Sequence, residues 1–251
     1  MGLREKSVQV LKILSALAAT LIAGCGNPNA VDSESLATQA LWVGVRFEAT
    51  GNGSTGVNVE INEGGRSGND VRLSQNERLE VDANGFIVVL EEDEDFLDID
   101  YEGRVTTDAS DTLLTLSFYR ADGSVNDGTR VTLPGIFAIS SPSNDQEVVV
   151  GDVIDLQWAA PGSGMIALAI TTQCSGFTRA DFLDVPDNGS YAIDTAMLPG
   201  IQDPEIPREN GCALTVDLTR ERHGTLDQAF RGGGFVSAVQ MRTVKLQLAF
   251  N

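Results

Sequence analysis

Apolar and polar residues alternate along most of this chain with a period of two, whereas the 3.6-residue period of an amphipathic helix is nearly absent. Turn residues such as Asn84-Gly85 and Asp122-Gly123 separate the runs roughly every ten residues. This spacing predicts an all-β protein whose antiparallel strands pack as a sandwich. The runs of the first half are Leu41–Phe47, Val57–Ile61, Leu79–Val81, Leu97–Tyr101 and Leu114–Phe118.

A second series of strands is predicted after Pro134-Gly135, where proline and glycine interrupt the pattern. Ile154, Leu156 and Trp158 share one face of a strand, so we expect Trp158 in a core. Each half has about 100 residues, which is enough for a core of its own. The sequence therefore predicts two domains, 40–135 and 136–251, of which the second should fold alone.

The start of the second series resembles bacterial immunoglobulin-like or fibronectin-type envelope modules. In those modules a strand with Ser-Pro, here Ser141-Pro142, and a Gly-Asp turn, here Gly151-Asp152, precede a strand that ends in a buried tryptophan. The resemblance covers residues 136–251 and implies a β-sandwich. It brings no catalytic residues with it.

The N-terminus has the pattern of a targeting segment. Basic residues Arg4, Lys6 and Lys12 precede an apolar run of about a dozen residues, which is shorter than the ~20 that a spanning helix needs. Residues 21–25 read Leu-Ile-Ala-Gly-Cys and resemble the lipobox of bacterial lipoproteins. The resemblance implies a signal peptide over 1–24 that is removed, and a diacylglycerol with a further acyl chain, such as palmitate, on Cys25. An ordinary secretory signal with a chance cysteine is the alternative.

The lipobox implies a protein held on a membrane of the cell envelope. Two or three acyl chains anchor a protein firmly, whereas one chain binds only marginally. Gly26 follows the cysteine, and in enteric-type bacteria an aspartate there retains lipoproteins at the inner membrane, so the resemblance favours the outer membrane. Residues 25–39 are small and polar, and we expect them to form a lipidated N-terminus and flexible tether.

The charge of the chain argues against nucleic acid as a partner. Removing residues 1–24 leaves 14 basic and 35 acidic residues, a formal net charge of −21, and Lys245 is the only lysine among them. Nucleic-acid binding usually requires a basic patch. Solubility accounts for the acidity, and a cationic or metal partner is the alternative.

Two cysteines remain when Cys25 carries lipid. Cys174 shares its alternation with Ile170, and Cys212 shares its alternation with Val216, so both thiols should point into one core. In an oxidising compartment this parity predicts a Cys174–Cys212 disulfide. Two free buried thiols are the alternative.

The densest run of carboxylates is Glu91–Asp95, followed by Asp98, Asp100 and Glu102. Calcium takes six to eight oxygen ligands, so Asp93, Asp95 and Asp98 are candidate ligands in a folded loop. Same-face residues on a strand lie near 7 Å apart, which is too far to close easily on one ion. A solvated acidic face is therefore the main interpretation.

Other motifs point away from catalysis. Gly51–Gly56 matches G-x-G-x-x-G, but a strand rather than a helix follows it, so we expect a hairpin instead of a dinucleotide site. His223 is the only histidine, and no serine lies in a G-x-S-x-G motif. Trp42 faces away from Leu41 and Val43 and is either a stacking platform for a sugar or protein, or a covered residue.

The sequence thus indicates a non-catalytic, lipid-anchored envelope protein with a binding or structural role and an unknown ligand. A calcium-dependent adhesin or glycan-binding module is the first alternative. A hydrolase of envelope polymers is the second. The expected partners are the membrane, through the lipid, and an envelope protein or glycan.

Overall fold

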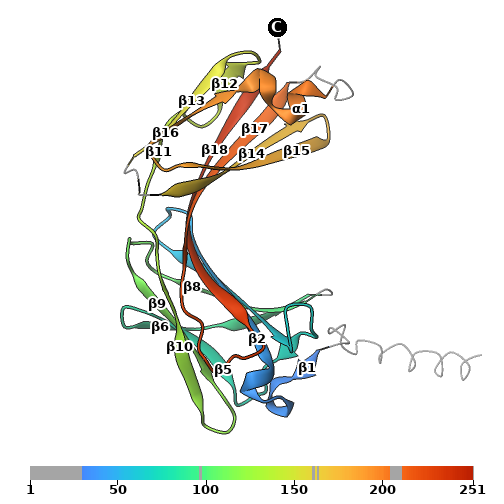
Figure 1. Cartoon of the computed structure of the whole chain (residues 1–251), viewed down its shortest axis with the longest axis vertical. Helices are drawn as coiled ribbons and strands as arrows, with labels where there is room; N and C mark the ends of the chain where they lie inside the picture. The colour runs from blue at the N-terminus through green and yellow to red at the C-terminus, as the bar shows by residue number, and fades with distance from the viewer. Residues whose placement is uncertain (1–29, 96–97, 160–161, 163, 204–210, 251) are drawn as a thin grey trace, which may run out of the picture.

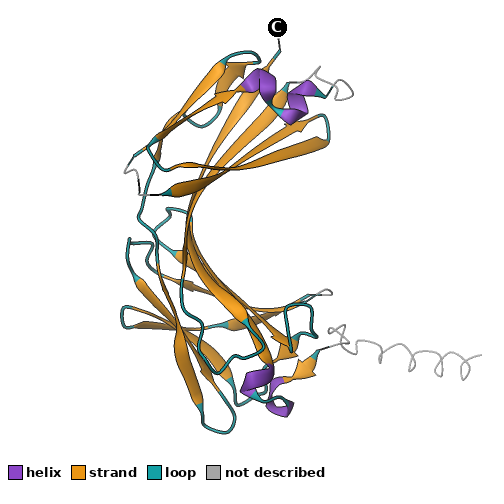
Figure 2. Cartoon of the chain, in the orientation of Figure 1, coloured by secondary structure: helices purple, strands orange, loops and turns teal. Residues whose placement is uncertain are grey.

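The computed structural model describes residues 30–95, 98–159, 162, 164–203 and 211–250. Regular structure in these ranges is nearly all β-strand (Figure 2), so the predicted all-β class is confirmed. No helix in this part of the chain is long and apolar enough to cross a bilayer. The helical pieces are the short turns η1 (Ser33–Ser35), η2 (Thr38–Ala40), η3 (Thr195–Met197) and α1 (Pro199–Gln202).

One large curved sheet runs through both halves of the molecule and lines the inner side of a bend (Figure 1). Two smaller sheets lie on its outer side, one in each of two lobes. The first lobe contains residues 30–133 and the second lobe residues 137–203. The last two strands of the chain complete both lobes. In spatial order the large sheet contains β15 (Phe177–Pro186), β14 (Met165–Cys174), β17 (Cys212–His223), β18 (Gly234–Ala249), β2 (Leu41–Ala49), β3 (Thr55–Glu63), β8 (Ile99–Val105) and β7 (Glu91–Glu94), and β12 (Gln146–Val149) also pairs with β18.

The first lobe is a sandwich of the large sheet and a four-stranded sheet. Inward-facing residues such as Val45, Val59 and Tyr101 form one buried cluster with those of the smaller sheet, as the period of two predicts. The Tyr101 hydroxyl donates to the Val71 carbonyl and accepts from the Leu73 N–H, both at 2.8 Å, and burial raises the pKa of Tyr101 far above its usual value. The smaller sheet has the order β10 (Val125–Thr132), β9 (Leu113–Tyr119), β5 (Arg78–Ala83) and β6 (Phe86–Val89), and β1 (Val31–Asp32) pairs in parallel with β4 (Val71–Arg72).

The second lobe packs β11 (Ile139–Ser141), β13 (Val153–Trp158) and β16 (Ser190–Asp194) against the other half of the large sheet. Trp158 is buried in this core, as predicted, and its indole N–H donates to Asp187 at 2.8 Å. Arg220 donates to the same carboxylate from 2.6 Å. Burial by itself would raise the pKa of Asp187, but the hydrogen bonds from Arg220 and Trp158 outweigh it and hold that pKa below its usual value.

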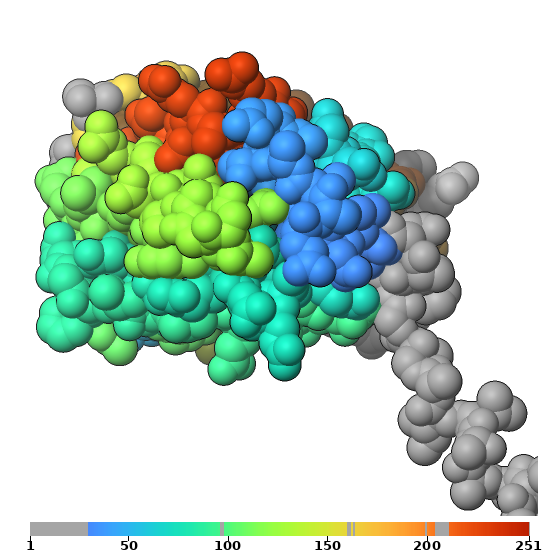
Figure 3. Space-filling model, turned by 90° about the horizontal axis from the view of Figure 1, so that it is seen from below, coloured from blue at the N-terminus to red at the C-terminus, as the bar shows by residue number. Residues whose placement is uncertain are grey.

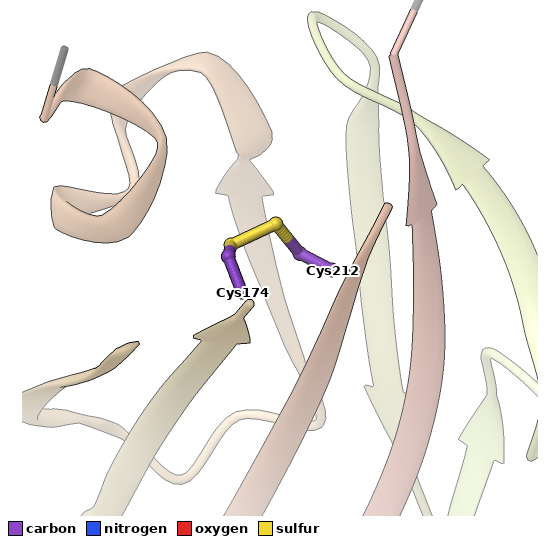
Figure 4. The surroundings of a disulfide bond; sticks show 2 residues. All are labelled: Cys174 and Cys212. Atoms are coloured by element: carbon purple, nitrogen blue, oxygen red, sulfur yellow. A yellow bond between two sulfur atoms is a disulfide. The ribbon is translucent and has the colours of Figure 1, made fainter. Parts of the chain in front are cut away.

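The predicted disulfide between Cys174 and Cys212 is confirmed (Figure 4). It joins the end of β14 to the start of β17, and both cysteines lie in the second core. The bridge closes a loop with a sequence separation of 38 residues. In the chain-entropy model such a loop stabilises the fold by about 3–4 kcal/mol.

The last strand, β18, contributes to both lobes, which differs from the expected pair of separate antiparallel sandwiches. Its first half pairs in parallel with β2, and it pairs in antiparallel with β17 along almost its whole length. Val236 and Ala238 therefore belong to the first core, whereas Val244 and Leu246 belong to the second. The physical reason is length, because β18 has 16 residues and extends past the junction. The boundary at 135/136 stays a prediction.

Side chains of β17 also cross the junction between the lobes. Besides Asp187, Arg220 bonds the Gly135 carbonyl at 3.0 Å. Arg222, two residues further along the strand, reaches Asp111 of the first lobe at 2.8 Å. These contacts attach the connecting segment and the first lobe to the same strand.

The segment 30–39, expected to be part of a flexible tether, is folded against the first lobe. The Arg120 guanidinium donates to the carbonyl oxygens of Ser33 at 2.9 Å and Leu36 at 2.8 Å, and it forms a buried ion pair with Glu77 at 2.9 Å. Figure 3 shows the blue start of the described chain beside the yellow-green hairpin that carries Arg120. The composition of this segment predicted a tether, because the residues that hold it, such as Arg120, lie far away in the sequence.

Candidate functional site

The chain passes from one sheet of the first lobe to the other at Leu90. β6 is the edge strand of the smaller sheet, and β7, which begins at Glu91, is the edge strand of the large sheet. Leu90 is buried beneath Gly103 of β8, where an added Cβ would lie 2.5 Å from Leu90 Cδ2. Glycine at 103 thus makes room for the leucine, and the two edge strands form one continuous side of the lobe.

β6 is apolar at every position although it lies at an edge. The side chains of Phe86, Ile87 and Val89 are 71%, 63% and 52% exposed, and Val88 is half-buried. The turn Asn84-Gly85, with positive φ at both residues, joins β6 to β5 and fixes its register. Exposed apolar residues gathered on one strand make β6 a candidate contact surface.

The backbone of β6 has hydrogen-bonding groups directed away from its sheet. The N–H of Leu90 donates to the Leu79 carbonyl, and Val81 is the register partner of Val88. In an antiparallel ladder hydrogen-bonded pairs alternate with non-bonded pairs, so the backbone groups of Ile87 and Val89 point outward. Among the described residues no strand pairs with that side of β6. An edge of this kind is a template for an additional strand.

β7 places negative charges beside this apolar edge. Glu91 is paired in register with Glu102, and Asp93 with Asp100, so like charges face each other across the strands. Such pairs are destabilising. In the described part of the chain no cationic side chain forms an ion pair with these four carboxylates. On the opposite face of β7, by contrast, Arg72 pairs with Glu92 and Glu94.

A cavity of about 580 Å³ lies where β6, β7 and β8 meet. A second cavity of about 260 Å³ shares Glu102 and Arg104 with it and extends toward Arg46 on β2. Arg104, which is the only base among the described residues that line the larger cavity, donates to the Ser54 hydroxyl at 2.9 Å. We call β6 together with Glu91 and Asp93 the binding edge. The larger cavity is lined by Val88, Val89, Glu91, Glu92, Asp93, Glu102, Gly103 and Arg104.

The structure does not gather Asp93, Asp95 and Asp98 into a calcium site. Asp95 and Asp98 contact each other instead, since the Asp98 N–H donates to the Asp95 carboxylate at 3.1 Å and the Asp95 N–H to the Asp98 carbonyl at 3.2 Å. Burial, with repulsion from Asp100 and Asp95, raises the pKa of Asp98. No group of three His, Cys, Asp or Glu side chains in the described ranges is arranged to hold a metal ion. Asp93 instead lies in register opposite Asp100 of β8.

The other sequence candidates lie elsewhere. Trp42 is only 7% exposed and packs edge-on against Phe235 with ring centroids 5.9 Å apart, so it is a covered residue and the stacking hypothesis is wrong. The His223 side chain is 76% exposed, and its nearest charged partner is Glu221 at 4.0 Å. Gly51–Gly56 forms the predicted hairpin between β2 and β3. Cys25 lies outside the described residues.

Sequence reasoning missed the apolar half of the binding edge. The signal was present, because Phe86-Ile87-Val88-Val89 is a continuous apolar run directly after Asn-Gly, whereas neighbouring strands alternate. A continuous run usually indicates a strand buried on both faces. Only the sheet order shows that this strand lies at an edge.

No family model matches the sequence, and no curated protein sequence matches it significantly. Among solved structures, the fibronectin(III)-like modules of Clostridium thermocellum CbhA are 12% identical, with a TM-score of 0.23 over 84% of this chain and 94% of that one. A cytokine receptor complex is 10% identical, with a TM-score of 0.29 over 79% of this chain and 94% of that one.

A third similar structure is Bacteroides ovatus SGBP-B, of a mixed-linkage glucan utilization locus, in complex with a mixed-linkage heptasaccharide. It is 11% identical, with a TM-score of 0.21 over 91% of this chain and 68% of that one. Likenesses at these scores assign neither a family nor a ligand to this chain.

Proposed function

We propose that this chain is a non-catalytic binding protein, anchored through lipid on Cys25 to the cell envelope, with the outer membrane as its location. The observation that carries the binding role is the binding edge, where Phe86, Ile87 and Val89 expose apolar surface on an unpaired strand. Covering apolar surface stabilises a complex by about 25 cal/mol per Å² before the costs of association. The edge thus offers contact surface for a partner.

The short connection to Cys25 supports a role close to the lipid. The folded chain begins by Val31, whose N–H donates to the Asp70 carbonyl at 2.9 Å, and four residues separate Cys25 from Ala30. A chain of that length reaches at most about 18 Å. A lipidated Cys25 would therefore hold the first lobe next to the membrane surface, where its partner would be an envelope component.

Membrane fractionation with intact-mass measurement tests the anchor. The wild-type chain is expected in the membrane fraction, cleaved before Cys25 and heavier by its acyl chains. Cys25→Ser should lose both the mass increment and the membrane association, whereas the neighbouring control Asn27→Ala should keep both. A Cys25→Ser protein that retains a lipid-sized increment would contradict the anchor.

Photo-crosslinking in intact cells tests the binding role. A photoreactive amino acid at Ile87 should give a discrete adduct with an envelope component, because this side chain lies on the binding edge. The same amino acid at Asp155, an exposed position on β13 of the second lobe, is the control and should give none. Equal crosslinking at both positions, or none at Ile87, would contradict the proposed function.

A further inference from the structure

We propose that the partner of the binding edge is an extended peptide segment of another envelope protein, apolar over one stretch and basic over the next, which adds to the first lobe as a fifth strand beside β6. This inference rests on the proposed function and names its partner class. Strand addition draws affinity from main-chain hydrogen bonds and specificity from alternate side chains. The binding edge provides both kinds of contact.

The main-chain contacts follow from the register of β5 and β6. The outward N–H and C=O groups of Ile87 and Val89 lie two residues apart, as do the groups that an incoming strand presents. Few devices that normally block such pairing occur in β6, which contains neither proline nor a charged residue. The acidic residues begin only after Leu90.

The side chains of β6 offer apolar contacts on both faces of the added strand. Val88 is the register partner of Val81, so Phe86 and Val88 lie on the face toward the core. Ile87 and Val89 lie on the outer face, where their register partners are Asp82 and Glu80. A partner strand with β-branched residues would cover apolar surface on either face.

The charges of β7 indicate that the part of the peptide beside it should be basic. Beyond Val89 the binding edge continues with Glu91 and Asp93, each opposite another carboxylate of β8. Basic side chains there would relieve the repulsion between the paired carboxylates. An antiparallel partner passes β7 before β6, so its basic residues should precede its apolar ones.

Charge also argues against two other occupants. A second copy of this chain would bring a further net charge of −21 and its own acidic β7 to the interface. An anionic lipid surface would be repelled by the same carboxylates. A basic and apolar peptide is the occupant that both halves of the binding edge fit.

Fluorescence anisotropy with synthetic peptides tests the inference. The protein is the mature chain, residues 25–251 with Cys25→Ser and its disulfide formed. The probe is a labelled, capped peptide Lys-Arg-Lys-Thr-Val-Thr-Val-Thr, and the controls are the reversed sequence and a version with Glu in place of each basic residue. We expect saturable binding of the probe, at least about tenfold weaker binding of the acidic peptide, and weakening by salt.

Two changes separate strand addition from simple charge attraction. Ile87→Pro removes an outward N–H without removing a hydrogen bond to β5, and it should lower the affinity for the probe at least about tenfold. Ile87→Val should change that affinity by no more than about twofold. If Ile87→Pro fails to fold by thermal melting, a probe N-methylated at alternate residues replaces it and should bind at least about tenfold more weakly. Unchanged affinity in this test would overturn strand addition.

Three other outcomes would overturn the inference. The first is no binding of the probe or of the peptide with the reversed sequence. The second is a dimer in sedimentation that Ile87→Pro abolishes. The third is binding of the chain to phosphatidylglycerol vesicles that depends on Ile87. If Ile87 still crosslinks to an envelope component in cells while the peptides fail, the proposed function stands and only the partner class is wrong.

Discussion

The strands β6 and β15 are both edges, yet they differ in how the sequence protects them. β15 has ten residues and exposes Phe182 at 79%, but Arg179, Asp181 and Asp184 interrupt its apolar residues and Pro186 ends it. Helix α1 also packs against β15. β6 has four residues, all apolar, with no charge and no proline, and no helix in the described part of the chain packs over it.

Exposed apolar area alone therefore does not define a binding strand. Charged residues, proline and covering elements are the usual means by which proteins prevent unwanted pairing. β15 has all three of them, whereas β6 has none of them as far as the chain is described. Each lobe contains a buried ion pair, Glu77–Arg120 in the first and Asp187–Arg220 in the second, and the second lobe also contains the disulfide.

The greatest loss of stability should come from removing the buried Asp187–Arg220 ion pair. Arg220→Met leaves the Asp187 carboxylate buried without its partner, which costs about 3–5 kcal/mol of stability. Denaturant unfolding followed by Trp158 fluorescence in a Trp42→Phe background measures the second lobe. The matched control Arg222→Met removes an exposed ion pair and should cost far less. Equal losses would contradict a special role for the buried pair.

The same pair predicts acid sensitivity of the second lobe. The pKa of Asp187 is lower in the folded state than its unfolded value of about 3.9, so its stabilisation is complete above that value and is lost as the pH falls through the folded pKa. Unfolding measured between pH 6 and pH 2 should therefore show a loss of stability below about pH 4. The Asp187→Asn variant should lack this loss of stability below about pH 4. If its stability falls with pH as that of the wild type does, the loss does not arise from Asp187.

Removing the disulfide should be the next largest change. Cys174→Ala with Cys212→Ala is expected to cost about 3–4 kcal/mol, because the unfolded chain loses its closed loop. Trp158 should report a lower unfolding midpoint. Binding of the basic probe at 25 °C should persist if the double variant stays folded, since the binding edge belongs to the first lobe. Loss of probe binding by a folded variant would show that the two ends are coupled.

Much of this architecture could be predicted from the sequence because it depends on local alternation. The strands around Val45, Val59 and Leu116, the buried Trp158 and the disulfide all follow from the period of two. The parallel pairing of β18 with β2 could not be predicted, because its register depends on residues far apart in the chain. The position of β6 at an edge was hidden for the same reason.

A smaller effect is expected at Gly103, which makes room for Leu90. Gly103→Val places side-chain atoms against Leu90 and should cost about 1–3 kcal/mol through overpacking. It should also lower the affinity for the peptide probe, because Leu90 connects β6 to β7. Glu102→Val, at the neighbouring exposed position, is the control for stability. Full stability of Gly103→Val would contradict the proposed packing role.

The smallest effect on stability, with the clearest effect on binding, is expected from a charge in the binding edge. Ile87→Lys should change stability by no more than about 0.5 kcal/mol because the side chain is exposed, but it should abolish binding of the basic probe. Phe182→Lys on β15 is the matched control, which removes a similarly exposed apolar residue and should leave the affinity unchanged. Equal effects of the two changes would erase the distinction between the strands.

Amide hydrogen exchange at single-residue resolution shows which strand the probe pairs with. In the free protein the Ile87 and Val89 amides should exchange quickly, while the Val88 amide, bonded within the sheet, should be protected. With the basic probe bound, Ile87 and Val89 should become protected and the amides of β15 should not change. Protection that arises on β15, or none at Ile87 and Val89 under saturating probe, would contradict the account.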